Sequence, residues 1–322
     1  MPFGVGRVRV TGAIVAVLLA LAGTPAPAAA TLLADQPYRI GFQGRLVTDV
    51  MIDGKGPFAF VIDTASSRSL MFEHVRAALG LTQSQPQPIT IYGINDVGQA
   101  MPVAPGEVSV AGETVHGLVM GVLPDEGPGG PDGILGVDVL SRYFVVLDRT
   151  AMRFKLLSSD SGAEQDYSGW THATLTPRPL RNFPIQFWYL DTRFNDVGFH
   201  SLFDLGASVT MMNWHAAEKL GVHQRDFKSF GPPPDQLRDV LGKDAPAVKL
   251  LGLEARMSSR IWGDQLVLVA NAPVFNYFDL DERPAAIVGL GLLGQNSLAI
   301  DFAGHKLYVG PTLGEDGKEK GS

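Results

Sequence analysis

Two acidic residues, Asp63 and Asp204, are the main candidates for chemistry in this chain of 322 residues. Each follows an apolar run and precedes small residues, a pattern typical of a strand that enters a tight turn. If the fold brings the two carboxyls together, they cannot both ionise cheaply, so the pair holds one proton. The ionised member can then take a proton from a water molecule while the protonated member polarises a peptide carbonyl. Such general acid–base hydrolysis requires no metal and no cofactor.

The sequence around these two acids is repeated. Their separation is 141 positions (204 − 63 = 141), and the same offset relates Ser67 to Ser208, Met71 to Met212, His74 to His215 and Leu79-Gly80 to Leu220-Gly221. Further on, residues 134–136 match residues 287–289 at an offset of 153 (287 − 134 = 153). The second half has therefore gained 12 residues (153 − 141 = 12), which we assign to a Pro-rich loop around residues 231–234.

Both halves of the chain predict the same short elements. Apolar runs at 58–62 and 199–203 have strand composition, and the segments 72–79 and 214–220 predict short helices that end at Gly80 and Gly221. The stretches 89–92, 108–110, 143–147 and 297–300 predict further strands. The 37 glycines and 22 prolines also favour short strands joined by turns. We therefore expect an all-β protein.

The length and the repeat predict two domains. We expect a signal peptide at 1–30, a first lobe at 31–158, an interlobe linker at 159–180, a second lobe at 181–312 and a disordered tail at 313–322. Two equivalent lobes related by a pseudo-twofold axis would place Asp63 opposite Asp204.

The first thirty residues predict export. Two arginines precede an apolar stretch at 12–21, and a region of small residues that fits A-x-A cleavage sites ends at Ala30. We expect a periplasmic or secreted protein with no stable membrane span after the signal is removed, with an uncleaved anchor as the alternative. The chain has no cysteine, which excludes disulfides and thiol catalysis. Its formal charge of −7 and the lack of a basic run argue against a nucleic-acid partner.

The acidic tetrapeptides resemble a known signature. Asp63-Thr64-Ala65-Ser66 and Asp204-Leu205-Gly206-Ala207 are similar to the Asp-Thr/Ser-Gly-Ser/Thr/Ala motif of aspartic proteases. Each half also has an element similar to the hydrophobic-hydrophobic-Gly segment that passes beneath the active-site loop in that family, namely Ile134-Leu135-Gly136 and Ile287-Val288-Gly289. Residues 132–141 resemble bacterial retropepsin-like sequences, whereas the doubling within one chain is pepsin-like.

The resemblance implies a fold, a function and a flap. The fold would be the acid protease fold, with two β-barrel-like lobes around a central cleft. The protein would be a monomeric endopeptidase with the catalytic residues Asp63 and Asp204, acting on a polypeptide held in extended form. In the family a β-hairpin flap commonly carries a Tyr-Gly pair, which Tyr92-Gly93 would match, with Gly98 supplying the turn; the alternative is a partly buried strand tyrosine.

Three positions depart from the family pattern. A hydroxyl after each catalytic acid typically braces the opposite loop, which Thr64 can do and Leu205 cannot. Ala65 replaces the usual glycine and requires a backbone that avoids positive φ. Ser66 offers a hydroxyl near Asp63 that Ala207 cannot offer near Asp204, and this predicts that Asp204 is the protonated member of the pair.

Other functions remain open on the sequence alone. Leu205 is compatible with a binding protein that has lost activity and holds peptides or other partners in the cleft of the same duplicated fold. A purely structural envelope module is a third possibility. The matched residues His74 and His215 could suggest a shared metal site, but no further ligand cluster accompanies them, and we expect them on the outside of each lobe.

Overall fold

The computed structural model describes residues 31–159, 166–179, 186–228, 235–238 and 241–312. The predicted signal peptide, the Pro-rich segment at 231–234 and the predicted tail at 313–322 lie outside the described residues. Within the described ranges, no helix combines the length and the apolar character needed to cross a bilayer.

The protein is mostly β, as the sequence predicted. The first half of the chain forms β1 (Leu32–Ile40), the 3-10 turn η1 (Phe42–Gly44), β2 (Leu46–Ile52), β3 (Lys55–Ile62), β4 (Leu70–Phe72), α1 (Glu73–Leu79), β5 (Ile89–Tyr92), β6 (Val97–Val103), β7 (Glu107–Val110), β8 (Glu113–His116), β9 (Met120–Leu123), β10 (Gly133–Leu135), α2 (Val137–Leu140), β11 (Tyr143–Asp148) and β12 (Arg153–Ser158).

The rest of the chain continues with short strands and short helices. These are β13 (Thr171–Thr174), β14 (Thr176–Pro179), β15 (Gln186–Phe194), β16 (Val197–Phe203), β17 (Met211–Met212), α3 (Trp214–Lys219), α4 (Gln224–Lys228), β18 (Asp235–Arg238), β19 (Asp244–Met257), β20 (Arg260–Ala270), α5 (Val274–Tyr277), β21 (Ala285–Val288), α6 (Leu290–Leu293), β22 (Asn296–Asp301) and β23 (Lys306–Thr312).

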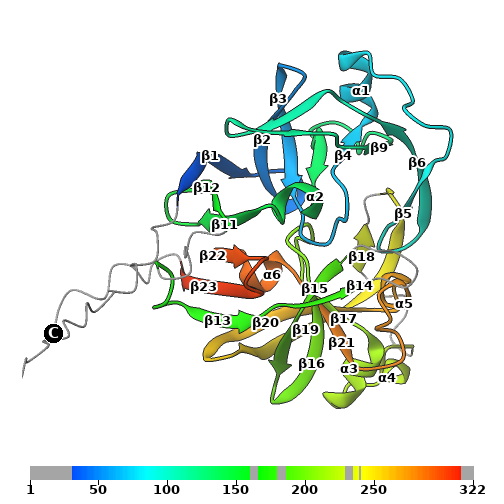
Figure 1. The fold of residues 1–322 in the computed structure, drawn as a ribbon. Helices are drawn as coiled ribbons and strands as arrows, with labels where there is room; N and C mark the ends of the chain where they lie inside the picture. The colour runs from blue at the N-terminus through cyan, green and yellow to red at the C-terminus, as the bar shows by residue number, and fades with distance from the viewer. Residues whose placement is uncertain (1–30, 160–165, 180–185, 229–234, 239–240, 313–322) are drawn as a thin grey trace, which may run out of the picture.

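The strands form two sheets. The larger follows the order β13-β23-β22-β11-β12-β1-β2-β3-β10-β4-β9-β6-β5, with β7 on β2 and β8 on β7. The smaller follows β14-β15-β16-β21-β17-β20-β19-β18. The C-terminal strands β22 and β23 therefore join the sheet of the first half (Figure 1). The stretch 159–180, expected as the linker, carries β13 and β14, which pair with β23 and β15.

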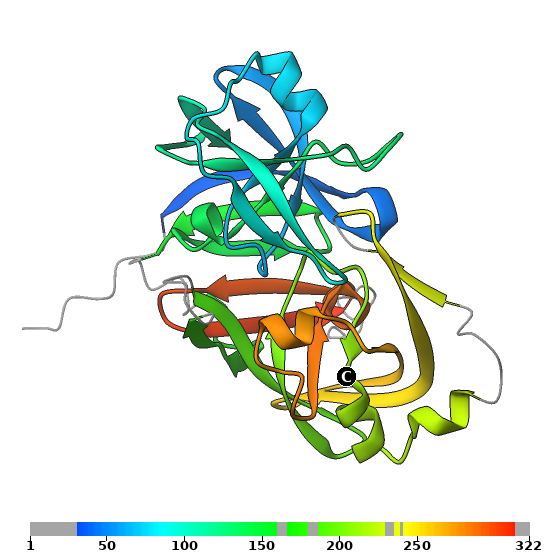
Figure 2. The ribbon, with the colours of Figure 1, turned by 90° about the vertical axis from the view of Figure 1, so that its right-hand side faces the viewer.

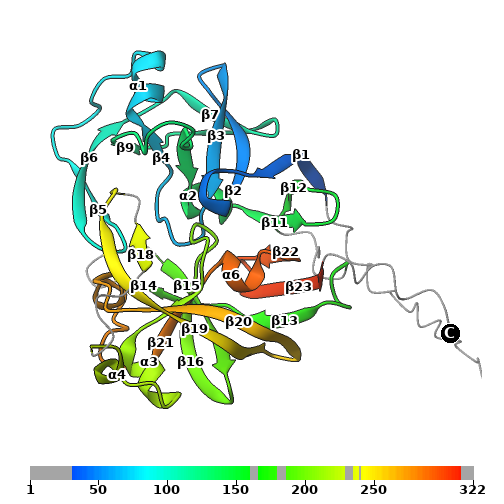
Figure 3. The same ribbon diagram turned by 180° about the vertical axis from the view of Figure 1, so that it is seen from behind.

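The blue and cyan elements of the first half and the orange elements of the second occupy opposite ends of the molecule, with β22 and β23 between them (Figure 2). The view from behind shows the same arrangement, with β5 close to β18 (Figure 3).

The predicted helices α1 and α3 are confirmed, and each is followed by the glycine that the sequence indicated. Gly80 has φ 70° and Gly221 has φ 82°, in the left-handed region that glycine adopts without a Cβ penalty. The main hydrophobic core draws on both halves, with Phe60 and Phe203 each fully buried within it. These strand residues come shortly before the two acids, so burial of the strands fixes where the acidic loops begin.

Candidate active site

Asp63 is positioned by the pairing of β3 with β10. The two strands run parallel, with Val61 beside Ile134 and Ile62 beside Leu135. The backbone N–H of Asp63 then donates to the carbonyl of Leu135 at 3.0 Å. The predicted hydrophobic-hydrophobic-Gly element therefore lies directly alongside the strand that carries the acid.

Asp204 is positioned in the same way. β16 runs parallel to β21, with Leu202 beside Ile287 and Phe203 beside Val288. The N–H of Asp204 donates to the carbonyl of Val288 at 3.0 Å. The two acids thus occupy matched places in matched strand pairs.

The glycines that end these elements allow a close backbone approach. A Cβ on Gly136 would lie 2.7 Å from the carbonyl oxygen of Ser66. A Cβ on Gly289 would overlap the carbonyl oxygens of Ala207 and Val209. Only glycine fits at 136 and 289, because each chain segment passes directly against the loop that follows its acid.

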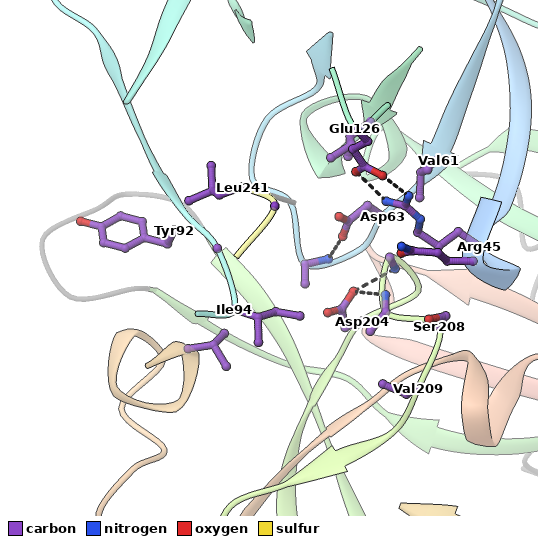
Figure 4. Close-up of a pocket in the computed structure, with 18 of the residues that line it drawn as sticks. Arg45, Val61, Asp63, Tyr92, Ile94, Glu126, Asp204, Ser208, Val209 and Leu241 are labelled. Carbon is purple, nitrogen blue, oxygen red and sulfur yellow. Dashed lines mark hydrogen bonds and ion pairs between the residues drawn. The ribbon is translucent and has the colours of Figure 1, made fainter. Parts of the chain in front are cut away.

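Asp63 and Asp204 line one pocket (Figure 4). The second loop approaches Asp63 so closely that a Cβ on Gly206 would overlap the Asp63 carboxyl. Ala65, the matched residue in the first loop, is not among the described residues with positive φ, so its backbone does not require glycine. The fold therefore brings together two acids that the sequence separates by 141 positions.

Thr64 braces the two loops. Its hydroxyl donates to the carbonyl of Phe203 at 3.0 Å and accepts from the N–H of Leu205 at 3.0 Å. Leu205 is fully buried and has no hydroxyl to return the interaction. The brace therefore runs from the first half to the second only.

The carboxyl groups accept backbone hydrogen bonds from their own loops. Oδ1 of Asp63 accepts from the N–H of Ala65 at 2.8 Å. Oδ1 of Asp204 accepts from the N–H groups of Gly206 and Ala207, at 2.8 and 3.1 Å. These bonds fix the position of Oδ1 in each carboxyl.

The hydroxyl of Ser66 does not act as the sequence predicted. It donates to the carbonyl of Arg68 at 2.7 Å, so it does not stabilise the charge on Asp63. The predicted cause of an asymmetric pair was therefore wrong, because the short side chain is used within its own loop.

The two acids nevertheless differ. Burial raises the pKa of Asp63 to about 6, against backbone hydrogen bonds from Ala65 and Ser66 and the positive charge of Arg45, which lower it. Burial and then the charge of Asp63 raise the pKa of Asp204 to about 8. Both carboxyls accept two backbone hydrogen bonds, so the difference comes from Arg45, whose positive charge lowers the pKa of Asp63, and not from a serine hydroxyl. This direction favours Asp204 as the protonated member of the pair.

These raised pKa values predict how stability depends on pH. Both carboxyls bind protons more tightly in the folded state, so their contribution to stability is fully present below their unfolded pKa and is lost as pH rises through about 6 and about 8. Asp204→Asn removes one of these charges. We expect its melting temperature to exceed that of wild type by a few degrees at pH 9. Calorimetry at pH 5 and pH 9 checks this, and a gain that does not grow with pH contradicts it.

Tyr92 and Gly93 lie at the end of a hairpin that reaches over the pocket. β5 pairs with β6, and the N–H of Gly93 donates to the carbonyl of Asp96 at 2.9 Å to close the turn. The predicted turn at Gly98 is wrong, because Gly98 lies within β6 beside Ile91. Tyr92 and Gly93 both line the pocket, and Tyr92 remains 38% exposed.

The tip of this hairpin contacts the second half of the chain. The carbonyl of Ile94 accepts from the N–H of Val274, at 3.0 Å. The Asn95 side chain donates to the carbonyl of Lys243 at 2.9 Å, and the Tyr92 ring packs 5.0 Å from the ring of Tyr277. The hairpin that lines the pocket therefore contacts the second half of the chain near its tip.

Arg45 and Glu126 form an ion pair in the pocket wall that the sequence did not reveal. Two nitrogens of the Arg45 guanidinium pair with the two oxygens of Glu126, and the side chains are only 10% and 11% exposed. Both residues line the pocket beside Asp63 (Figure 4). A buried pair of this kind requires both partners, because an unpaired charge there is costly.

The side chain of His74 contacts two carboxylates of a neighbouring loop. Its ring nitrogens contact Asp125 and Asp132 at 2.6 and 2.8 Å. Burial lowers the pKa of His74, but these hydrogen bonds raise it overall. Among the described residues, no group of three or more His, Asp or Glu side chains is placed to hold a metal ion.

A comparison with family models bears on the first half of this site. Residues 48–139 match the model of the aspartyl protease family. The matched region includes Asp63, the Tyr92 hairpin and Gly136. Asp204 lies outside it and is related to the matched region by the internal repeat. In a search of curated proteins, no relative matched the chain.

Proposed function

We propose that the protein is an aspartic endopeptidase in which Asp63 and Asp204 activate one water molecule. The charged Asp63 takes a proton from the water, and the protonated Asp204 donates a hydrogen bond to the carbonyl of the peptide bond. The resulting attack gives a tetrahedral intermediate without a covalent bond to the protein. Return of a proton to the amine leaving group completes hydrolysis.

One observation carries this proposal: the carboxyls of Asp63 and Asp204 line a single pocket and one raises the pKa of the other. Acids that were only turn-forming residues would not need to be buried in the same pocket. The match of residues 48–139 to the aspartyl protease family gives independent support for the first half.

The strand register supports two lobes related by a pseudo-twofold axis. Val146 and Ala299 are matched positions of the repeat (146 + 153 = 299), and they lie opposite each other where β11 meets β22. Antiparallel pairing of equivalent residues is what a twofold axis between them produces. In this proposal 31–158 and 181–312 form the lobes and the cleft lies between them.

The covered pocket supports an extended polypeptide as substrate. The hairpin that carries Tyr92 can clamp an extended chain with backbone hydrogen bonds and exclude water from the acids. We further propose that the protein acts as a monomer outside the cytosol after residues 1–30 are removed. The mature chain would then be periplasmic or secreted.

A binding protein on the same duplicated fold is the second candidate. The absence of a hydroxyl at Leu205 favours it, because Thr64 braces the second loop whereas no side chain at 205 can brace the first loop in return. Such a protein would hold extended peptides without cleaving them.

Hydrolysis of an unfolded protein between pH 4 and pH 9 separates the two candidates. The pair carries one proton between about pH 6 and about pH 8, so activity should rise through the first value and fall through the second. A statine-type peptide should inhibit it. Tight peptide binding with no product at any pH would favour the binding protein.

A further inference from the structure

A second pocket adjoins the pocket that contains Asp63 and Asp204. The two pockets share Ala65, Tyr92 and Phe278. The walls of the second pocket are largely apolar, and the residues that supply this surface are Leu70, Pro88, Ile89, Ile91, Phe187 and Phe278. Because the two pockets share these wall residues they adjoin each other, and we expect a peptide that lies across Asp63 and Asp204 to reach the second pocket.

Arg68 is the only charged side chain among the described residues that line this second pocket. The Arg68 side chain is exposed, and within the described part of the chain the structure gives its guanidinium no hydrogen bond or ion pair. The lining also contains the neutral polar side chains of Ser66, Gln85 and Thr90. An arginine in this setting offers several donors to an anionic group.

The backbone of Arg68 is held in place, although its guanidinium forms no hydrogen bond or ion pair with the described residues. Its carbonyl accepts from the Ser66 hydroxyl at 2.7 Å and lies against Gly136. The next residue, Ser69, donates through its N–H and its hydroxyl to Asp138, at 2.9 and 2.7 Å. The Arg68 side chain therefore extends from a fixed backbone position, five residues after Asp63.

The repeat shows that the fold itself does not need an arginine here. The residue matched to Arg68 is Val209 (68 + 141 = 209), which lines the first pocket. The chain carries a net charge of −7, so one cation at this position does not serve solubility.

Arg45, which lines the first pocket, differs from Arg68 in its surroundings. Val47 pairs with Val61 and Tyr189 pairs with Leu202, so the place matched to Arg45, two residues earlier, is Phe187. Arg45 is neutralised by Glu126, whereas Arg68 forms no ion pair among the described residues, and its charge acts only as a minor influence that lowers the pKa of the nearby Asp138. The two arginines thus differ in the charge of their surroundings.

We infer that Arg68 is a specificity-determining residue that binds a carboxylate carried by the substrate on one side of the cut bond. The carboxylate belongs to a Glu or Asp side chain or to the C-terminus of a short peptide, next to an apolar side chain that packs on Phe187 and Phe278. This inference rests on the proposed function, because it assumes that a peptide lies across the two acids.

The test uses peptides that differ at one position only. A single Glu or Gln is placed at each of four positions on either side of the cut bond, and a parallel set ends in a free carboxylate or an amide. We expect KM for Glu peptides to be about three- to tenfold lower than for Gln peptides, at one or two neighbouring positions on one side only. The terminal carboxylate set shows which source of the charge is recognised.

Substitutions assign the preference to Arg68. Arg68→Gln should abolish the difference between Glu and Gln peptides, and Arg68→Glu should favour Lys at the same position. Arg225→Gln, which removes a side chain 79% exposed in α4, is the matched control and should keep the preference. In wild type the preference should weaken at high salt. A preference that survives Arg68→Gln, or none at any position, overturns the inference.

Binding separates this inference from the proposed function. Dissociation constants of the same peptides are measured on Asp63→Asn by fluorescence anisotropy. If wild type cleaves nothing but the carboxylate preference appears in binding and disappears with Arg68→Gln, the endopeptidase proposal fails and the role of Arg68 stands. If cleavage is normal and binding shows no preference, the endopeptidase proposal stands and the role of Arg68 is wrong. If nothing is cleaved and no peptide binds, both are wrong.

Discussion

Replacing either acid by asparagine is expected to abolish peptide hydrolysis. Asp63→Asn removes the group that takes the proton from water, and Asp204→Asn removes the carboxylic acid that donates a hydrogen bond to the carbonyl. General acid–base catalysis contributes about 10²–10⁴-fold, so kcat should fall by at least that range in each variant. The measurement is product formation from an unfolded protein at pH 7.

The two variants also control for each other. Because the acids act as a unit, the double variant Asp63→Asn/Asp204→Asn should lose little more activity than either single variant. Asp191→Asn is a matched control, since its side chain is 92% exposed, and it should retain full activity. Hydrolysis that persists in either single variant at the wild-type rate would rule out the pair.

Thr64→Val should lower both stability and activity. The substitution keeps the shape but removes the hydroxyl, and this leaves the carbonyl of Phe203 and the N–H of Leu205 buried without partners. Each lost partner costs about 1–3 kcal/mol, so we expect the free energy of unfolding in urea to fall by about 2–4 kcal/mol. Activity should fall as well, because small displacements of reacting groups cost up to about 10²-fold.

The conservative variant tests the reason given for this effect. Thr64→Ser keeps a hydroxyl at the same place and should lose no more than about 1 kcal/mol. If Thr64→Val is as stable as wild type, the brace between the two loops contributes nothing. If Thr64→Ser is as damaged as Thr64→Val, loss of the methyl group, and not of the hydroxyl, is responsible.

The sequence predicted those parts of the structure that are encoded locally or repeated. The strands that lead to Asp63 and Asp204 follow from apolar runs. The helix ends follow from the left-handed glycines, Gly80 at the C-cap of α1 and Gly221 directly after the C-cap of α3. The close packing of Gly136 beneath the first loop was expected from the resemblance to aspartic proteases. These features depend on residue type and spacing, which the sequence contains directly.

Features that join distant segments could not be predicted. Arg45 and Glu126 are 81 positions apart and belong to no repeated motif. The pairing of β22 with β11 leaves no periodic signal, because both strands are buried along almost their whole lengths and neither alternates between buried and exposed residues.

Local alternatives explain the two errors. The Ser66 hydroxyl reaches its own loop before it can reach Asp63, since the carbonyl of Arg68 is close by. The hairpin turn forms at Gly93 and Asp96 although Gly98 is also a plausible turn residue. In both cases the sequence offers more than one partner or turn, and the tertiary structure selects one.

The central claim is that Asp63 and Asp204 hold a common water molecule, and a crystal structure with a statine-type peptide tests it most directly. The hydroxyl of the inhibitor takes the place of that water. We predict that it lies within about 2.6–3.2 Å of an oxygen of each carboxyl, beneath the hairpin that carries Tyr92. An inhibitor bound elsewhere, or a hydroxyl in contact with only one of the two acids, would contradict the account.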